Sequence, residues 1–97
     1  MAVMVIIEWP DVTPGQYDQV RELVKWDVEP PIGCLYQAAA FDGKGLRVTD
    51  VYESPEHFQN FVDDRLMPGV QRIGIQGEPK VEVYPIHAVF APGYNPR

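Results

Sequence analysis

A hairpin signal at the centre of the chain constrains the fold more than any other feature of the sequence. Residues 42–45 read Asp-Gly-Lys-Gly, between strand-like segments at 33–42 and 46–53. A two-residue loop of this kind joins antiparallel strands, with glycine supplying the positive φ angle that the turn requires. Counting outward from this loop places Gln37 opposite Asp50 and Leu35 opposite Tyr52.

Two helix-start signals lie on either side of this hairpin. Thr13 is followed by proline at the first helical position and by Gln16 three residues later, which is the pattern of a capping box. Apolar residues at helical spacing continue this helix to residue 26 or 27. Ser54 starts a second helix in the same way, and we expect Pro68 to interrupt it before a short segment over 68–73.

Strands at the two ends of the chain complete the order of elements. Residues 2–9 are β-branched and apolar, and residues 80–90 predict a last strand in which Pro85 marks an edge or a bulge, before an extended tail over 91–97. The order is strand, helix, strand, strand, helix, strand. We predict a single α+β domain over 1–97 with the ferredoxin-like βαββαβ fold, in which both helices cover one face of a four-stranded antiparallel sheet.

The predicted sheet is apolar on both faces. In the first strand Val5 and Ile7 alternate with Met4 and Ile6, so apolar side chains point both ways. Helices on one face leave the other uncovered, and a second layer has to bury it. A second copy of the same sheet, related by a two-fold axis, is the simplest source of that layer, and we predict a homodimer that forms a dimeric α/β barrel.

Composition excludes several classes of function. Eight lysines and arginines against fourteen acidic residues give a net charge of −6, which argues against binding to nucleic acid or to anionic membranes. The single cysteine, Cys34, has no metal-site spacing with histidine, and no glycine-rich nucleotide loop is present. The first residues lack the pattern of a signal peptide, and no apolar stretch is long enough to span a bilayer. We expect a cytoplasmic protein that acts without a metal or cofactor.

Asp50 is the most informative acidic residue. It interrupts an apolar strand face between Val48 and Tyr52, where a charge is costly unless it is paired or hydrated. A carboxylate that faces a cavity would have a raised pKa and could act as an acid or base. The alternative is a structural aspartate bonded to Gln37 or Arg47, or one hydrated at the surface. Gln37 itself can orient a ligand but cannot carry a proton.

Histidines and aromatic residues supply the other candidates. His87, in the last strand, is a candidate general acid or base, or else a strand-edge or interface histidine bonded to backbone. His57, in the first turn of the second helix, is expected to face solvent. Five aromatic residues could line a pocket for a flat ligand, or could belong to the core or the dimer interface: Trp9, Trp26, Tyr36, Phe41 and Tyr52.

The segment 46–58 reads Leu-Arg-Val-Thr-Asp-Val-Tyr-Glu-Ser-Pro-Glu-His-Phe and is followed by Phe61 and by Arg-Leu-Met-Pro at 65–68. This pattern resembles the dimeric α/β-barrel superfamily, which holds antibiotic-biosynthesis monooxygenase-like domains, and its small, mostly uncharacterised bacterial members in particular. In those relatives tryptophan usually stands at the position of Tyr52, and histidine often at that of Gln37. The resemblance implies a dimer with a pocket between sheet and helices or inside the barrel.

The resemblance leaves several activities open, because the superfamily includes cofactor-independent monooxygenases, haem-degrading enzymes, isomerases, cyclases and proteins without a known reaction. The first hypothesis is an enzyme acting on an apolar or aromatic metabolite, with Asp50 and His87 in acid–base roles, and with Gln37 and Tyr52 orienting the ligand beside Trp9 and Tyr36. The second is a non-catalytic dimeric binding or accessory protein. The third is a purely structural dimer with a filled barrel.

Overall fold

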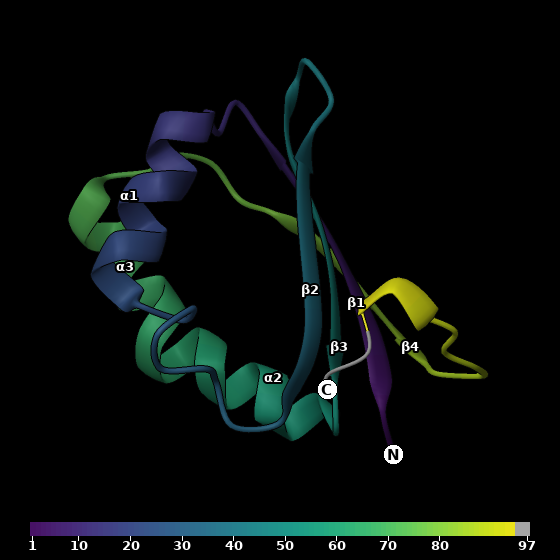
Figure 1. Cartoon of the computed structure of the whole chain (residues 1–97). Coiled ribbons are helices and arrows are strands. Elements are labelled where there is room, and N and C mark those ends of the chain that lie inside the picture. The colour runs from purple at the N-terminus through teal and green to yellow at the C-terminus, as the bar shows by residue number, and fades with distance from the viewer. Residues whose placement is uncertain (95–97) are drawn as a thin grey trace.

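The structure, a computed structural model that describes residues 1–94, is a four-stranded antiparallel sheet with helices on one face (Figure 1). The strands lie in the order β2-β3-β1-β4, as the ferredoxin-like prediction requires. Their bounds are β1 Val3–Pro10, β2 Cys34–Phe41, β3 Gly45–Tyr52 and β4 Lys80–Pro85. The helical elements are α1 Pro14–Val24, α2 Pro55–Phe61, the π-helical turn η1 Val62–Leu66, α3 Met67–Ile73 and the 3-10 turn η2 Pro92–Tyr94.

The hairpin between β2 and β3 has the predicted loop. Gly43 has a φ of 86°, and the Asp42 carboxylate accepts hydrogen bonds from the backbone of Lys44 at 2.8 Å and of Gly45 at 3.0 Å. Gln37 therefore lies opposite Asp50, as predicted. The prediction that Leu35 lies opposite Tyr52 was wrong. An irregularity between Cys34 and Tyr36 inserts one residue, and Cys34 takes the place opposite Tyr52.

The helix α1 begins where the sequence predicts and ends earlier. Both bonds of the capping box are present: the Gln16 N–H donates to Thr13 Oγ1 at 3.1 Å, and the Thr13 N–H donates to Gln16 Oε1 at 3.0 Å. The helix ends at Val24, because Lys25 adopts a left-handed conformation with a φ of 64°. Trp26 consequently lies in the connection rather than on the helix.

The second helical region continues through the residue expected to break it. Ser54 caps α2 by accepting from the His57 N–H at 3.2 Å, and helical backbone then runs through η1 into α3. The predicted short segment over 68–73 is present as α3, with Pro68 in its first turn, but the expected interruption before it was wrong. In the π turn the Met67 N–H bonds to the Val62 carbonyl, which widens the helix just where the Pro68 ring would meet the preceding turn. Among residues 1–94, no helix is long and apolar enough to cross a membrane.

The last strand is shorter than predicted. It ends at Pro85 rather than at residue 90, because proline has no N–H for the ladder and the chain leaves the sheet there. The Ile86 N–H still donates to the Ala2 carbonyl at 3.0 Å. The segment 86–94 then runs along the side of the sheet opposite the helices (Figure 1). Within the tail expected to be extended, η2 forms a turn, and residues 95–97 lie outside the described part of the chain.

The core lies between the sheet and the helices. Alternate residues of β1 and β3 point into it, and Val5 at the centre of β1 is fully buried. The opposite face of the same strands carries the half-buried side chains of Met4, Ile6 and Val51, so β1 and β3 have apolar residues on both faces, as predicted. At one corner of that second face, the Tyr94 ring packs edge-on to Tyr36, with centroids 6.2 Å apart.

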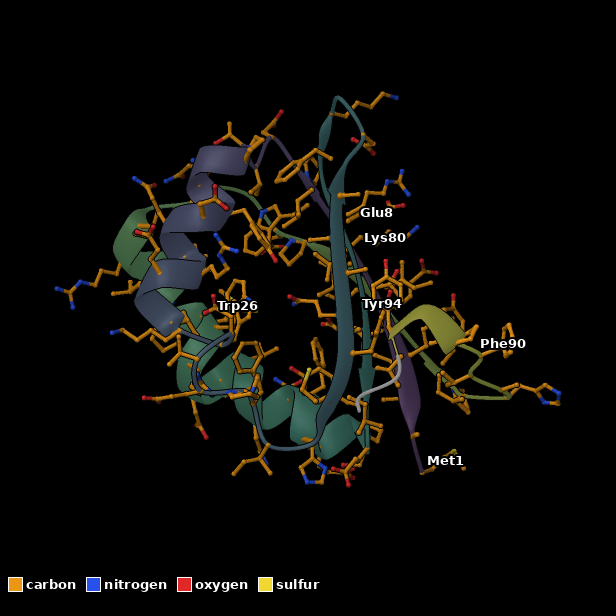
Figure 2. The ribbon with its side chains drawn as sticks, in the orientation of Figure 1. Met1, Glu8, Trp26, Lys80, Phe90 and Tyr94 are labelled. Carbon is orange, nitrogen blue, oxygen red and sulfur yellow. The ribbon has the colours of Figure 1, made fainter. Side chains whose placement is uncertain are left out.

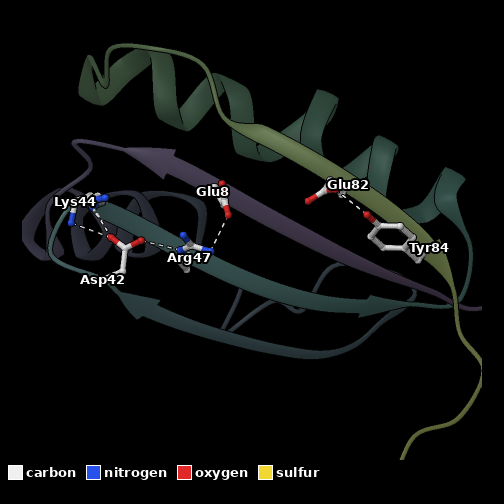
Figure 3. A network of polar contacts seen from close by, with 7 residues as sticks. Glu8, Asp42, Lys44, Arg47, Glu82 and Tyr84 are labelled. Carbon is white, nitrogen blue, oxygen red and sulfur yellow. Dashed lines mark hydrogen bonds and ion pairs between the residues drawn. The ribbon is translucent and has the colours of Figure 1, made fainter.

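Charged residues occupy the other end of this second face. The Arg47 guanidinium lies 2.7 Å from the Asp42 carboxylate and 2.6 Å from that of Glu8 (Figure 3). Lys80 faces Glu8 in the register of β1 and β4. The Arg47 side chain is half exposed, so these ion pairs contribute little to stability. Arg47 points away from the core and is no partner of Asp50, which removes one of the structural explanations for that aspartate.

Candidate functional site

A cavity of about 220 Å³ lies between the helix-facing side of the sheet and the helices. Its walls are almost entirely apolar, and Figure 2 shows Trp26 reaching into the space between the two layers. The aromatic and large apolar residues that line it include Ile7, Trp9, Tyr17, Trp26, Leu46, Val48, Phe58, Phe61, Leu66, Met67 and Val70. Two polar side chains from the hairpin, Gln37 and Asp50, reach the same cavity.

Local sequence explains how these walls arise. The period of two along β1 and β3 sends every second residue toward the helices. On the helical side, α2, η1 and α3 each contribute lining residues, because the backbone remains helical through Pro68. Trp26 and Phe61 meet edge-on with centroids 6.4 Å apart, and they close one side of the cavity.

Asp50 is the buried charge of the cavity. Its exposed fraction is 3 %, and it is the one acidic residue in the buried core of the described chain. Burial raises the pKa of its carboxyl group to about 6, and hydrogen bonding from Gln37 opposes this rise. Within residues 1–94 its Oδ1 atom has no hydrogen-bond partner. Asp50 therefore adds an ionisable group with an unpartnered oxygen, close to its titration point at neutral pH, to the wall of a mainly apolar space.

Gln37 and Tyr17 extend this polar group toward α1. The Tyr17 hydroxyl donates a hydrogen bond to Gln37 Oε1 at 3.3 Å. The Tyr17 ring packs edge-on to Trp26 at 5.5 Å and to Phe41 at 6.2 Å between centroids. Burial raises the pKa of the Tyr17 phenol, so it remains a neutral donor at physiological pH. Tyr17, Gln37 and Asp50 form a row of polar groups from α1 across β2 to β3.

Three of the predicted site residues line the cavity, and three do not. Asp50, Gln37 and Trp9 line it, and the Trp9 indole N–H donates to the Gln76 carbonyl at 3.2 Å. Neither His87 nor Tyr36 is among the described lining residues. His87 is exposed beyond the end of β4, and Tyr36 lies on the other face of the sheet against Tyr94. The structure thus does not bring His87 together with Asp50.

Tyr52 is the third residue outside the cavity wall. It is almost fully buried and lies two residues along β3 from Asp50. Its ring packs edge-on to Phe58 with centroids 5.4 Å apart, and burial raises the pKa of its phenol far above the ordinary value. The residue belongs to the core beside the cavity.

The side chains of His57 and Cys34 pack within the fold and lie away from the cavity wall. His57 is half buried against Gly33, where a Cβ atom would lie 2.5 Å from the His57 ring. The His57 Nδ1 atom is 2.6 Å from Ser54 Oγ, so the side chain belongs to the helix start rather than to solvent. Burial raises the pKa of the Cys34 thiol, as fits a small apolar side chain. No cluster of possible metal ligands occurs in the described part of the chain.

Sequence reasoning missed the role of Tyr17. Tyr17 is one of several residues at helical spacing in α1, and nothing local distinguishes its hydroxyl from that of any half-buried tyrosine. Two expectations taken together could have predicted that the Tyr17 hydroxyl meets Gln37. An apolar stripe that packs on the sheet and a polar Gln37 on the same side of the neighbouring strand bring the two side chains together.

Comparison with known proteins supports the fold. No family model and no curated protein sequence matches the chain. Among solved structures, SnoaB, a cofactor-independent oxygenase from Streptomyces nogalater, superposes with a TM-score of 0.63 at 8 % identity, over 91 % of this chain and 94 % of that one. The ActVA-Orf6 monooxygenase from Streptomyces coelicolor, solved with nanaomycin D, gives 0.61 at 20 % identity over 94 % and 91 %.

A third neighbour is a dimeric ferredoxin-like protein of unknown function from Thermobifida fusca, with a TM-score of 0.62 at 16 % identity over 89 % of this chain and 92 % of that one. At these identities the likeness is one of fold. The chain has the fold of antibiotic-biosynthesis monooxygenase-like and dimeric ferredoxin-like proteins, and this confirms the fold that the sequence resemblance implied.

Proposed function

We propose that the chain binds a small apolar or aromatic molecule in the cavity between sheet and helices. One observation carries the proposal: the buried Asp50, one of whose carboxyl oxygens has no partner among residues 1–94, lies in the wall of a space lined by apolar and aromatic side chains. A free carboxylate of this kind is costly in a core that has only structural duties. A ligand that supplies the missing hydrogen bond offsets that cost.

The volume of the cavity limits the ligand. About 220 Å³ is below the ~300–1,000 Å³ of common drug-sized sites. A flat molecule of one or two rings matches both this volume and the aromatic walls.

A cofactor-independent enzyme is the more specific form of this proposal. Asp50, with its pKa near 6, would take a proton from a weakly acidic position on the bound molecule and return it. Such a step is common to the monooxygenase, isomerase and cyclase types of reaction. Two structural neighbours are named as a cofactor-independent oxygenase and a monooxygenase, which supports this direction through the fold alone.

A non-catalytic binding or accessory protein is the second candidate. It is favoured by the partner of Asp50, because an amide at Gln37 carries no proton. The other titratable side chain in the wall is Tyr17, whose pKa is raised. His87 and Tyr36 lie outside the cavity, so any role of theirs belongs to the other face of the sheet. On that face we propose a homodimer, and we place the protein in the cytoplasm.

Chemical-shift mapping tests the binding site. We expect naphthalene, added to the ¹⁵N-labelled protein, to perturb backbone and indole signals of wall residues such as Trp26, Phe61 and Val48. Signals from Tyr84 on the other face serve as the internal control. Perturbations confined to the Tyr84 face would contradict the cavity proposal, and an absence of any perturbation would favour a filled structural core.

Proton exchange separates catalysis from binding. In deuterated buffer we expect the protein to accelerate exchange of the α-protons of 2-tetralone, a two-ring ketone, and Asp50→Asn to abolish the acceleration. Equal exchange rates for both proteins at the same buffer concentration, with naphthalene bound by both, would select the non-catalytic candidate.

A further inference from the structure

The orientation of the Gln37 amide is the feature of the cavity that binding alone leaves unexplained. An amide can present either its oxygen or its two N–H groups to a neighbour. Facing Asp50, the oxygen would repel the carboxylate, whereas the N–H groups would stabilise it. Gln37 lies on the edge strand β2 and is exposed as a residue, so the strand itself does not fix the choice.

Tyr17 supplies the missing constraint. Its hydroxyl donates to Gln37 Oε1, and a phenol with a raised pKa stays a donor rather than an acceptor anion. The Trp26 and Phe41 rings flank the Tyr17 ring and hold its hydroxyl in place. With the oxygen of the amide engaged on the side of α1, its N–H groups remain for Asp50, which lies opposite Gln37 on β3 and whose pKa Gln37 lowers by hydrogen bonding.

We propose that Tyr17 is a positioning residue, which fixes the Gln37 amide so that Asp50 keeps one oxygen free for a hydrogen-bond donor on the bound molecule. The selection of a ligand rests on the proposed function. The positioning of Gln37 by Tyr17 rests on the geometry of the three side chains. Asp50 Oδ1 is an acceptor without a partner among residues 1–94. The site therefore selects flat ligands that carry a hydroxyl or N–H group over isosteres in which that group is capped.

The groups around Asp50 do not titrate near pH 6, so a change of charge at that pH can be assigned to Asp50. The titratable groups near it are Tyr17 on α1, Cys34 on β2 and Tyr52 on β3, and burial raises the pKa of all three. The helical wall above Asp50 contributes apolar lining residues from α2, η1 and α3, together with Gln59. Around pH 6 Asp50 is thus the group in this cluster that changes its charge.

The first experiment follows the Asp50 ¹³Cγ signal against pH in the intact protein. We expect a midpoint near pH 6 in the wild type, and a midpoint higher by about half a pH unit or more in Tyr17→Phe, because the freed amide no longer holds its N–H groups on the carboxylate. Gln37→Leu should raise the midpoint at least as far. The double variant should match Gln37→Leu alone, since Tyr17 acts through Gln37.

Tyr84→Phe is the matched control, because it removes an exposed hydroxyl that bonds to Glu82 on β4, away from the cavity. An unchanged midpoint in Tyr17→Phe would overturn the positioning role. So would a double variant that titrates well above Gln37→Leu, since Tyr17 would then act on Asp50 by another route. Amide spectra of each variant verify that the fold is intact.

The second experiment compares 2-naphthol with 2-methoxynaphthalene by calorimetry at pH 7.5. We expect 2-naphthol to bind about tenfold or more tightly, as fits a hydrogen bond to a charged acceptor, and this preference to shrink in Tyr17→Phe. Equal affinities in the wild type would overturn donor selection. If neither probe nor naphthalene binds, the proposed ligand function fails, and the titration still decides the role of Tyr17.

Discussion

At the scale of single residues, Asp50 is the main candidate for the chemistry of the cavity, and its ionisation lowers the stability of the fold. The period of two along β3 was enough to predict that a carboxylate interrupts an apolar face, and the hairpin loop was enough to place Gln37 opposite it. The same period also places Arg47 on the opposite face, where Asp42 and Glu8 hold it, so it already excluded Arg47 as a partner of Asp50. It could not show that one oxygen of Asp50 has no partner among residues 1–94. Nor could it reveal the Tyr17 hydroxyl, which depends on how α1 packs on the sheet.

Asp50→Asn should change how stability depends on pH. The pKa of the carboxyl group is about 6 in the folded chain and about 3.9 in the unfolded chain, so the native state binds the proton more tightly. In the wild type, ionisation of Asp50 therefore destabilises the fold as pH rises from about 4 to about 6. The free energy of unfolding of Asp50→Asn, relative to wild type, should rise by roughly 2–3 kcal/mol over that window.

Urea denaturation at pH 4, 5, 6 and 8 measures this difference. Comparison of the two proteins cancels the other carboxylates, including Asp42, whose pKa of about 2 reflects its bond to Arg47. A constant difference between variant and wild type across these pH values would show that Asp50 is not a desolvated acid.

At the scale of elements, the predictions are most accurate where a short segment of sequence determines the local structure. The capping box of α1, the cap at Ser54 and the two-residue hairpin loop are all local patterns, and all three form. The errors lie where tertiary packing overrides a local rule. Pro68 is accommodated by a π turn, and β4 ends at Pro85 because the chain crosses to the other side of the sheet.

Gly69→Ala tests the contact between α1 and α3. A Cβ atom at this position would lie 2.6 Å from Val24 Cγ2, closer than packed atoms allow. Helix propensity alone favours alanine by about 1 kcal/mol, but the overpacking should prevail and lower the free energy of unfolding by about 1–3 kcal/mol. Gln71→Ala, an exposed substitution in the same helix, should leave stability within about 0.5 kcal/mol. Thermal and urea unfolding measure the stability of both variants. A Gly69→Ala variant that is more stable than the wild type would contradict this packing.

At the scale of the whole molecule, the second face of the sheet remains the main surface without a full cover. The sequence predicted that this face is apolar, but not that segment 86–94 of the same chain runs along it (Figure 1). That segment itself exposes apolar groups: Phe90 is 90 % and Val89 is 64 % exposed (Figure 2). Met4, Ile6 and Val51 add half-buried apolar side chains on the same side of the sheet, and we propose that a second copy covers them.

Ile6→Arg should separate a dimer into monomers. Ile6 is half buried on the second face, at the middle of β1, and its side chain points away from the helices, so a charge there spares the core. We expect the wild type to be a dimer at micromolar concentration by light scattering, and Ile6→Arg to be a folded monomer. Gln19→Arg, on the exposed side of α1, should remain dimeric. A well-folded wild-type monomer at those concentrations would refute the interface.

The short hairpin loop has a consequence for the order in which the site is assembled. Gln37 and Asp50 belong to neighbouring strands joined by only two loop residues, so they meet through a local closure of the kind that takes microseconds. The helix α2 follows β3 directly, but α1 and α3, which complete the helical layer, are far apart in the chain and meet only across the hairpin and α2. We therefore expect the carboxylate to meet its amide while still in water, and to lose its hydration only when α1 and α3 dock. We expect proton uptake during refolding at pH 5 to coincide with the closing of the cavity rather than with the formation of the sheet.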